Sequence, residues 1–322
     1  MSAVAELLDR IRQYFRSPNR DAQAFALWGD RAKERQNSTR PIVAWTDSII
    51  VSRRYIHPQI SGRPDSNWLE WAAQRYFSAP AECALSVGSG DGGFERHGLA
   101  VGLANRFEAF DASPGAVELA TQLGKTHGVD DRVTYVVADL NHHRFEPLRY
   151  DAAFASMAVH HIQDLEHFFV QVRRALKPGA LFIMNEFVGP NQFQWTAPQM
   201  ELADALLQRI PERYRRSLIS GYTKSRVTRQ TLAAMNQVDP TEAVRSADII
   251  PLMRAHFELV EQVDYGGTLL NLILEEIAGN FSDTDEDFAV LEPLFDAERD
   301  YLRRGVISSD FTVLVGRCPG PS

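Results

Sequence analysis

The sequence predicts an α/β protein built on a doubly wound, largely parallel β-sheet. Short apolar runs alternate with helical stretches between residues 82 and 186, and a glycine cluster directly follows the first run. Short buried strands of this kind form parallel sheets that helices cover on both faces, joined by right-handed crossovers. The expected strands, each separated from the next by a helical stretch, are residues 84–87, 107–110, 133–137, 152–155 and 180–184.

Residues 1–80 are expected to form an N-terminal helical cap segment. Apolar residues at helical spacing predict a helix over residues 7–15 and a second helix that carries Phe25 and Trp28. Asp21 is the expected N-cap of this second helix, because its carboxylate can accept bonds from free backbone N–H groups. The segment precedes the strands instead of alternating with them, so it could cover the sheet or a ligand.

A loop is predicted over residues 39–64, where the helical pattern loosens. The stretch is rich in aromatic and basic residues. Trp45 and Tyr55 could close a binding pocket from here, although aromatic side chains more often belong to a core. Ser66 is then expected to begin a helix that runs up to the first strand.

Between the strands, residues that start and stop helices stand at the expected places. Ser113 is a predicted N-cap, and Pro114 follows it at the first helical position. Apolar residues between Leu165 and Leu176 form one stripe at helical spacing, which Lys177-Pro178-Gly179 ends. These signals support the alternation of strands and helices.

After residue 186 the alternation changes into a mostly helical pattern. Two further strands are expected, at residues 257–263 and 311–315. Residues 268–277 are nearly all apolar on one side, which favours a core helix and leaves a homodimer face or a substrate wall as the alternatives. The predicted organisation is an N-terminal cap, a ligand-binding core, a helical insertion and a C-terminal part with the last strands, over residues 1–80, 81–186, 187–256 and 257–322.

Composition excludes several classes of partner. The net charge of −8 and the pI near 5.6 give no basic field for nucleic acid, whose binding depends on Lys and Arg meeting phosphates. No apolar run is long enough to span a bilayer, and the charged N-terminus does not resemble a signal peptide. Two cysteines are too few for a disulfide framework. We therefore expect a cytoplasmic protein with a small-molecule partner.

The glycine cluster is typical of a loop that holds an adenosine-containing cofactor. Gly88-Ser89-Gly90-Asp91-Gly92-Gly93 follows a short apolar strand and precedes a helical stretch. Its spacing fits both G-x-G-x-x-G, used for dinucleotides, and G-x-G-x-G, used for S-adenosylmethionine. Asp111 ends the second strand, where a carboxylate can accept bonds from ribose hydroxyls of either cofactor.

The ends of the third and fourth strands distinguish the two cofactors. Asp139-Leu140 follows the third strand, where an acidic residue could accept from an adenine amine. Ser156-Met157-Ala158-Val159-His160-His161 follows the fourth, before the Leu165 stripe.

Taken together, these segments resemble the class I S-adenosylmethionine-dependent methyltransferases, in the bacterial branch that acts on small molecules and in saccharide pathways. The resemblance covers residues 83–186, roughly the middle third of the chain. It implies S-adenosylmethionine as the cofactor and a Rossmann-like seven-stranded sheet whose last strand, residues 311–315, runs antiparallel. One position departs from the family pattern: Ser86 stands where an acidic residue often anchors the methionine ammonium.

The resemblance also implies which residues bind the cofactor. The glycine loop would shape the site, Asp111 would hold the ribose, and Asp139 with Leu140 would frame the adenine. The loop that ends at His161 would lie beside the methionine end. The implied cofactor-binding residues are Gly88, Ser89, Gly90, Asp91, Gly92, Asp111, Ala112, Ser113, Asp139, Leu140, Ser156, Met157, Ala158 and His161.

His160, His161 and Glu186 are the candidate catalytic residues. A hydroxyl acceptor benefits from a general base, and an imidazole titrates near neutrality. Each candidate also has a structural interpretation, as a buried packing residue or a loop cap. We therefore expect methyl transfer to a hydroxyl of a small molecule or glycan. The alternatives are transfer to nitrogen, sulfur or carbon, an NAD-dependent oxidoreductase, and a non-catalytic S-adenosylmethionine-binding protein.

No metal site is predicted. His142-His143 and His160-His161 are adjacent pairs, not the i, i+4 pair of a helical zinc site, and no cysteine joins them. Asp139 and Asn141 are too few for the carboxylate cluster of a metal-dependent methyltransferase.

Overall fold

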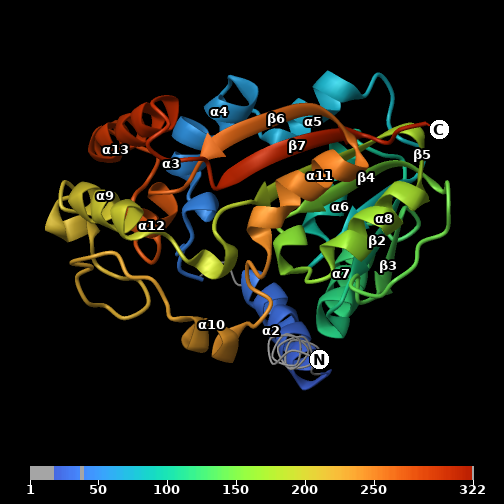
Figure 1. Cartoon of the computed structure of the whole chain (residues 1–322), viewed down its shortest axis with the longest axis horizontal. Helices are drawn as coiled ribbons and strands as arrows, with labels where there is room; N and C mark the ends of the chain where they lie inside the picture. The colour runs from blue at the N-terminus through green and yellow to red at the C-terminus, as the bar shows by residue number, and fades with distance from the viewer. Residues whose placement is uncertain (1–17, 37–39, 321–322) are drawn as a thin grey trace, which may run out of the picture.

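The computed structural model describes residues 18–36 and 40–320, and the helix predicted over residues 7–15 lies outside them. The described chain contains a seven-stranded sheet with the order β3-β2-β1-β4-β5-β7-β6, in which β7 runs antiparallel to both of its neighbours. Figure 1 shows this sheet with helices on both sides. The strands are β1 Ala84–Val87, β2 Phe107–Asp111, β3 Val133–Val137, β4 Tyr150–Ser156, β5 Leu176–Phe187, β6 Glu258–Gly266 and β7 Phe311–Arg317.

The predicted sheet is confirmed, including its antiparallel last strand. β1 and β3 have the predicted bounds, whereas β5 is longer than predicted because pairing with β4 and β7 extends it at both ends. One expectation is wrong: the chain between β3 and β4, residues 138–149, forms turns and no helix. This crossover holds the Asp139 turn instead.

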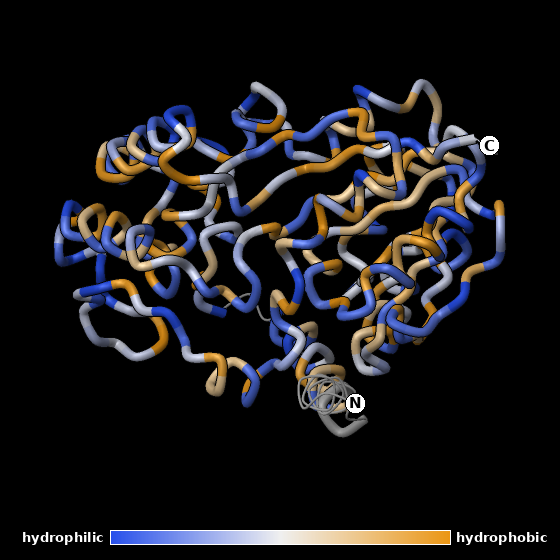
Figure 2. Tube along the Cα trace, viewed as in Figure 1, coloured by the Kyte–Doolittle hydropathy of each residue, from blue (hydrophilic) through white to orange (hydrophobic). Residues whose placement is uncertain are grey.

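Side chains of the strands alternate between two buried faces of the sheet. In β4, Ala152 and Phe154 belong to one apolar cluster, and Ala153 and Ala155 belong to the other. α5 Trp68–Tyr76 and α6 Gly93–Ala100 cover the first face, and α8 Leu165–Ala175 and α11 Ile249–His256 cover the second. Figure 2 shows hydrophobic residues along the strands. α7, Pro114–Thr126, connects β2 to β3 and begins at the predicted N-cap Ser113.

The N-terminal segment is helical over more of its length than predicted. α2 begins at Pro18, so the expected N-cap Asp21 lies inside the helix. The capping box of α5 uses Asn67, one residue after the expected Ser66. The predicted loop is instead a series of short helices, because apolar residues such as Ile50 and Ile60 pack into the core. The helices of this segment are α2 Pro18–Arg35, η1 Trp45–Asp47, α3 Ile49–Val51, η2 Ser52–Ile56 and α4 His57–Ser61.

The helices after β5 extend the core of the sheet at one end of the molecule (Figure 1). Most of their apolar residues join the cluster on the α5 and α6 face, whereas Ile249 and Met253 of α11 belong to the cluster on the other face, so these helices form no separate core. α12 is buried in this cluster, which excludes the dimer-face interpretation of that stretch and confirms a core helix. The remaining helices are η3 Val159–His161, η4 Asn191–Phe193, α9 Ala197–Leu207, η5 Glu212–Tyr214, α10 Leu232–Val238, η6 Ser246–Asp248, α12 Leu270–Leu274, η7 Ala278–Asn280 and α13 Asp285–Arg303.

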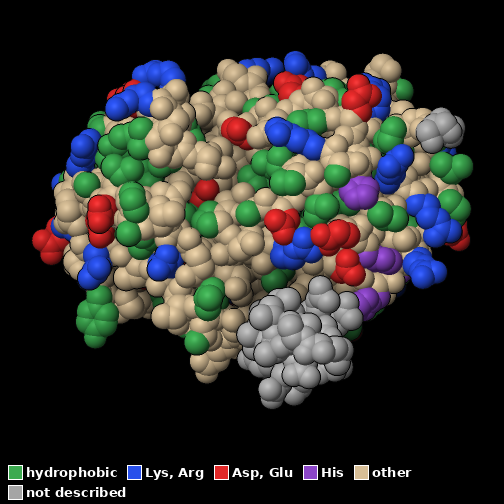
Figure 3. Space-filling view, in the orientation of Figure 1, with side chains coloured by type: hydrophobic (Ala, Val, Ile, Leu, Met, Phe, Trp, Pro, Cys, Tyr) green, Lys and Arg blue, Asp and Glu red, His purple; other side chains and the backbone are tan. Residues whose placement is uncertain are grey.

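On the face shown in Figure 3, acidic and basic side chains are interspersed, with no broad basic patch. None of the described helices is both long and apolar enough to cross a membrane.

Candidate active site

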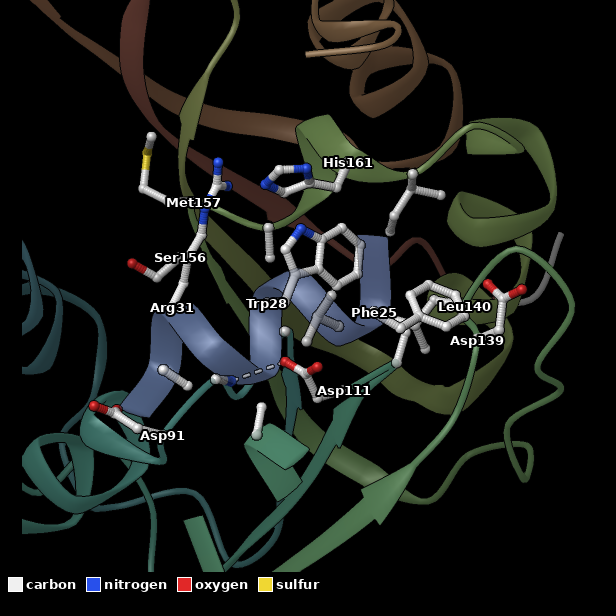
Figure 4. A pocket seen from close by; sticks show the side chains of 18 of the residues that line it. Phe25, Trp28, Arg31, Asp91, Asp111, Asp139, Leu140, Ser156, Met157 and His161 are labelled. Atoms are coloured by element: carbon white, nitrogen blue, oxygen red, sulfur yellow. Dashed lines mark hydrogen bonds between the residues drawn. The ribbon is translucent and has the colours of Figure 1, made fainter. Parts of the chain in front are cut away.

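A pocket lies where β1, β2 and β4 end, and α2 forms its opposite wall (Figure 4). Strand ends at this edge of a doubly wound sheet are the usual place for a ligand. The lining residues from the sheet side are Val87, Gly88, Gly90, Asp91, Asp111, Ala112, Ala116, Asp139, Leu140, Asn141, Ser156, Met157, Ala158, His161 and Ile162. Those from α2 are Phe25, Trp28, Arg31, Ala32 and Arg35.

The glycine loop passes close to the loop that follows β4. Gly88 has a φ of +70°, and a Cβ atom there would lie 2.2 Å from the Cβ of Ala158. Any side chain at position 88 would therefore push the two loops apart. The backbone N–H of Gly90 donates to Asp111 Oδ2 at 2.8 Å (Figure 4). The Ser113 N–H donates to Oδ1 at 2.8 Å. Burial raises the pKa of Asp111, and these two backbone bonds oppose the rise.

Most residues that the resemblance implies for cofactor binding line this one pocket, and three do not. Ser89 is a buried residue of the glycine loop itself, Gly92 is the N-cap of α6, and Ser113 caps α7. Their positions give them a part in shaping the loops. The direct cofactor contacts of the lining residues stay a prediction.

The loop after β4 is held from below by Glu186. Its Oε1 accepts the backbone N–H groups of Ala158 and Val159, each at 2.6 Å, and its Oε2 lies 2.7 Å from His160 Nδ1. Glu186 is fully buried and does not line the pocket. Met157, at the start of the loop, has a positive φ of +51°, a strained conformation that persists only where surrounding contacts enforce it. This geometry supports the interpretation of Glu186 as a loop cap with a positioning role, and its catalytic role stays a prediction.

Of the two predicted histidines, only His161 lines the pocket. His160 is buried behind it, with Glu186 on one ring nitrogen and Glu242 Oε1 3.4 Å from the other. Burial disfavours the charged form of His160, but the two carboxylates outweigh it and raise the pKa to about 10. Burial, together with the neighbouring His160 charge, lowers the pKa of His161. His161 therefore presents a neutral imidazole to the pocket.

His160, His161 and Glu242 form a cluster whose ligand-type atoms all lie within 4.8 Å of one another. The sequence does not predict this cluster, because Glu242 follows α10 and lies about 80 residues from the histidines. Thr241, its neighbour, lies 3.3 Å from His161 Nδ1 and donates to Asp239.

α2 forms the wall of the pocket that faces the sheet edge. The Trp28 ring lies 4.9 Å from the His161 ring, and its indole N–H donates to Asp239 Oδ2 at 3.0 Å. Figure 4 shows the side chains of Trp28 and Arg31 extending from α2 on the side of Met157 and His161. The sequence predicts this helix but not its place, because an amphipathic pattern does not identify what the apolar face packs against.

Trp45 and Tyr55, which could have closed a pocket, lie in the core instead. Both are almost completely buried, and the Tyr55 hydroxyl donates to Glu298 at 2.7 Å. The predicted loop around them is helical, so their side chains point into the cluster on the sheet face.

Comparison with known proteins agrees with this fold. Residues 85–184 match the family described as a methyltransferase domain. A geranyl diphosphate C-methyltransferase from Streptomyces coelicolor A3(2) has a similar structure, with a TM-score of 0.53 over 94% of this chain and 98% of that chain. Its sequence identity is 12%, so this likeness concerns the fold. The fold and the matched domain together define a class I S-adenosylmethionine-dependent methyltransferase.

The sequence relatives of the chain include methyltransferases named for a sterol and for a naphthoquinone. It is 30% identical over 181 residues to a sterol 24-C-methyltransferase of Yarrowia lipolytica, covering 54% of this chain and 46% of that protein. It is 24% identical over 147 residues to a 2-phytyl-1,4-naphtoquinone methyltransferase of Trichormus variabilis, covering 45% and 64%. The matched part is thus less than two thirds of either relative. Over residues 85–184 the chain thus carries a methyltransferase domain, as its motifs predict.

Proposed function

We propose that this protein transfers a methyl group from S-adenosylmethionine to a hydroxyl oxygen of a small molecule or glycan. The observation that carries the proposal is the pocket itself, in which the Gly88 loop, the Asp111 carboxylate and His161 face one space beneath α2. S-adenosylmethionine, when bound, supplies a methyl group on a positively charged sulfur. The chain must then position the acceptor in line with that methyl group and exclude water.

The pocket residues divide these tasks. Asp111 keeps lone pairs on both oxygens beyond the two backbone bonds, so it can accept from ribose hydroxyls. His161 lines the pocket, and its lowered pKa favours the neutral imidazole. As a base, this imidazole can take the proton of an acceptor hydroxyl. α2 lines the space with Phe25 and Trp28, whose apolar rings would help to keep water from the reacting groups.

A second candidate is methyl transfer to carbon. The Yarrowia relative is named for methylation at carbon, and the structurally similar Streptomyces protein is also a C-methyltransferase. Such a reaction needs a positioned alkene or activated carbon and a base for the proton released afterwards. The same His161 would meet that requirement.

Cofactor binding tests the assignment first. We expect S-adenosylhomocysteine, but not NAD, to bind in calorimetry and to raise the unfolding temperature. Asp111→Asn keeps the side-chain shape and should weaken S-adenosylhomocysteine binding by about tenfold or more, equivalent to about 1.4 kcal/mol. The exposed Asp130→Asn is the matched control and should bind like the wild type. Equal affinity in the Asp111 variant would refute its role.

The acceptor atom is tested by supplying methyl donor with pools of hydroxylated and of alkene-bearing small molecules. We expect product from the hydroxylated pool, and loss of that product with retained cofactor binding in His161→Ala. Product from the alkene pool alone would favour the carbon acceptor.

A further inference from the structure

The His160, His161 and Glu242 cluster has the spacing of a metal site. The Nε2 atom of His160 and the Oε1 atom of Glu242 are 3.4 Å apart. Metal–ligand bonds of about 2.1 Å in a tetrahedral arrangement hold ligand atoms roughly 3.4 Å apart. The third ligand, from His161, lies within 4.8 Å of the other two, so a small side-chain rotation closes the site.

Glu186 orients His160 for such a role. His160 Nδ1 bonds to the Glu186 carboxylate at 2.7 Å, which directs the other ring nitrogen, Nε2, toward Glu242. Metal-binding histidines typically donate their second N–H to a carboxylate in this way. A metal ion bound between Nε2 and Glu242 would take the place of the proton that otherwise links these two groups.

The charges around the cluster leave room for a cation. Three carboxylates, from Glu186, Asp239 and Glu242, surround the two imidazoles. Among the described ion pairs that join these carboxylates to a Lys or Arg, the basic partner is Arg31, which lies 3.3 Å from Asp239 and 3.6 Å from Glu242. Its side chain is 41% exposed, so water screens part of its charge. Even with His160 charged, the three carboxylates therefore outnumber the two nearby cations, His160 and Arg31.

We propose that His160, His161 and Glu242 bind a divalent transition-metal ion at the His161 end of the pocket, with Glu186 as the positioning residue of His160. Two imidazoles and one carboxylate favour ions such as Zn²⁺, Fe²⁺ or Co²⁺ over Mg²⁺ or Ca²⁺, which prefer oxygen ligands. Three protein ligands also leave a coordination position open, as in catalytic metal sites. Because His161 lines the pocket, that position lies beside the acceptor space.

The role of the ion rests on the proposed function. An oxygen of the acceptor could bind at the open position, where the ion would make its hydroxyl more acidic. The oxygen would then bond to the methyl carbon as the carbon–sulfur bond breaks, and the hydroxyl proton would leave to bulk solvent. In the metal-loaded protein His161 is then a ligand, and the ion replaces it as the group that activates the hydroxyl.

Metal binding to the full chain tests the site without any acceptor. After treatment with EDTA and its removal, we expect calorimetry to find one Zn²⁺ per chain. Co²⁺ should give visible absorption bands that report nitrogen and oxygen ligands. His160→Ala and Glu242→Gln should each weaken Zn²⁺ binding at least tenfold. The exposed His127→Ala, at the C-terminal end of α7, should leave it unchanged.

Two results would overturn the metal site: no Zn²⁺ or Co²⁺ binding to the wild type, or equal binding to the cluster variants and the wild type. In the first case the positive charge between Glu186 and Glu242 would be that of the protonated His160 ring itself, with no metal ion. Retained S-adenosylhomocysteine binding in Glu242→Gln shows that this variant is folded. Methyl transfer without metal binding refutes the site alone, and metal binding without methyl transfer refutes the proposed function alone.

Discussion

Glu95 is a buried carboxyl group directly beneath the cofactor loop. It lies in α6 with no exposed surface, and Ser86 of β1 donates its hydroxyl to Oε1. Its Oε2 has no hydrogen-bond partner among the described residues. Ser86 is itself buried and does not line the pocket. At the position where the family often has an acidic residue, this chain therefore has a serine that bonds to an acidic side chain of α6, Glu95.

The pKa of Glu95 predicts a pH-dependent stability. Burial raises it from 4.5 to about 7, so between these values the folded state binds a proton that the unfolded state has lost. The contribution of Glu95 to the free energy of unfolding therefore falls as pH rises from 4.5 to 7, by up to about 1.4 kcal/mol per pH unit, and is constant outside this window.

Urea unfolding of wild type and Glu95→Gln at pH 5, 6 and 8 measures this effect. We expect the variant to gain stability relative to the wild type as pH rises. The exposed Glu118→Gln on α7 is the matched control and should show a constant difference. A pH-independent difference for Glu95→Gln would contradict the raised pKa.

Glu298 connects distant parts of the chain through one buried carboxyl. Its oxygens accept the Tyr55 hydroxyl and the backbone N–H groups of Gly267, Leu269 and Leu270. Tyr55→Phe removes one of these bonds and should lower the free energy of unfolding by about 1 to 2 kcal/mol. Chemical denaturation checks this value, with Tyr222→Phe, whose ring is 80% exposed, expected to change little. Similar stabilities of the two variants would show that the bond contributes nothing.

At the scale of elements, α2 approaches α7 through two glycines. A Cβ atom at Gly29 would lie 3.0 Å from Ser113 Oγ and 3.4 Å from the Gly115 backbone. A larger side chain at position 29 must therefore lift α2 from the start of α7. Because α2 lines the pocket with Trp28 and Arg31, its displacement should reach the cofactor.

Gly29→Val tests this contact. We expect about a tenfold loss of S-adenosylhomocysteine affinity, equivalent to about 1.4 kcal/mol, because the wall that includes Trp28 moves away. Calorimetry measures the affinity. Ala26→Val places the same side chain on an exposed position of α2 and should bind normally. An unchanged affinity in Gly29→Val would show that α2 does not help to hold the cofactor.

The elements also show what the sequence can predict. The strands are predictable because each is a short apolar run between turn residues, and burial on both faces leaves few other interpretations. The short helices over residues 39–64 are not predictable, because their apolar residues pack against α13 and the sheet. These partners are distant in the sequence, so the local pattern of hydrophobic residues does not reveal them. The same limit hides Glu242, which reaches the His160 loop only through tertiary packing.

At the scale of the whole molecule, α2 joins two regions around the pocket. Gln36, just after the helix, donates to Asp91 of the cofactor loop at 2.7 Å. Trp28 and Arg31 bond to Asp239, which follows α10 in the helical region after β5. A cofactor bound between α2 and the sheet would contact both sides of this arrangement, so its binding should stabilise α2 in place.

Hydrogen exchange on the full chain, with and without S-adenosylhomocysteine, measures that stabilisation. We expect amides of residues 22–36 to exchange at least tenfold more slowly with the ligand, since local opening of α2 would then require its release. α13 lines no part of the pocket and should exchange at the same rate in both states. Asp239→Asn weakens the contact with Trp28 and Arg31 and should reduce the protection of α2. Equal protection of α2 and α13 would instead indicate general stabilisation of the fold, with α2 having no part in enclosing the cofactor.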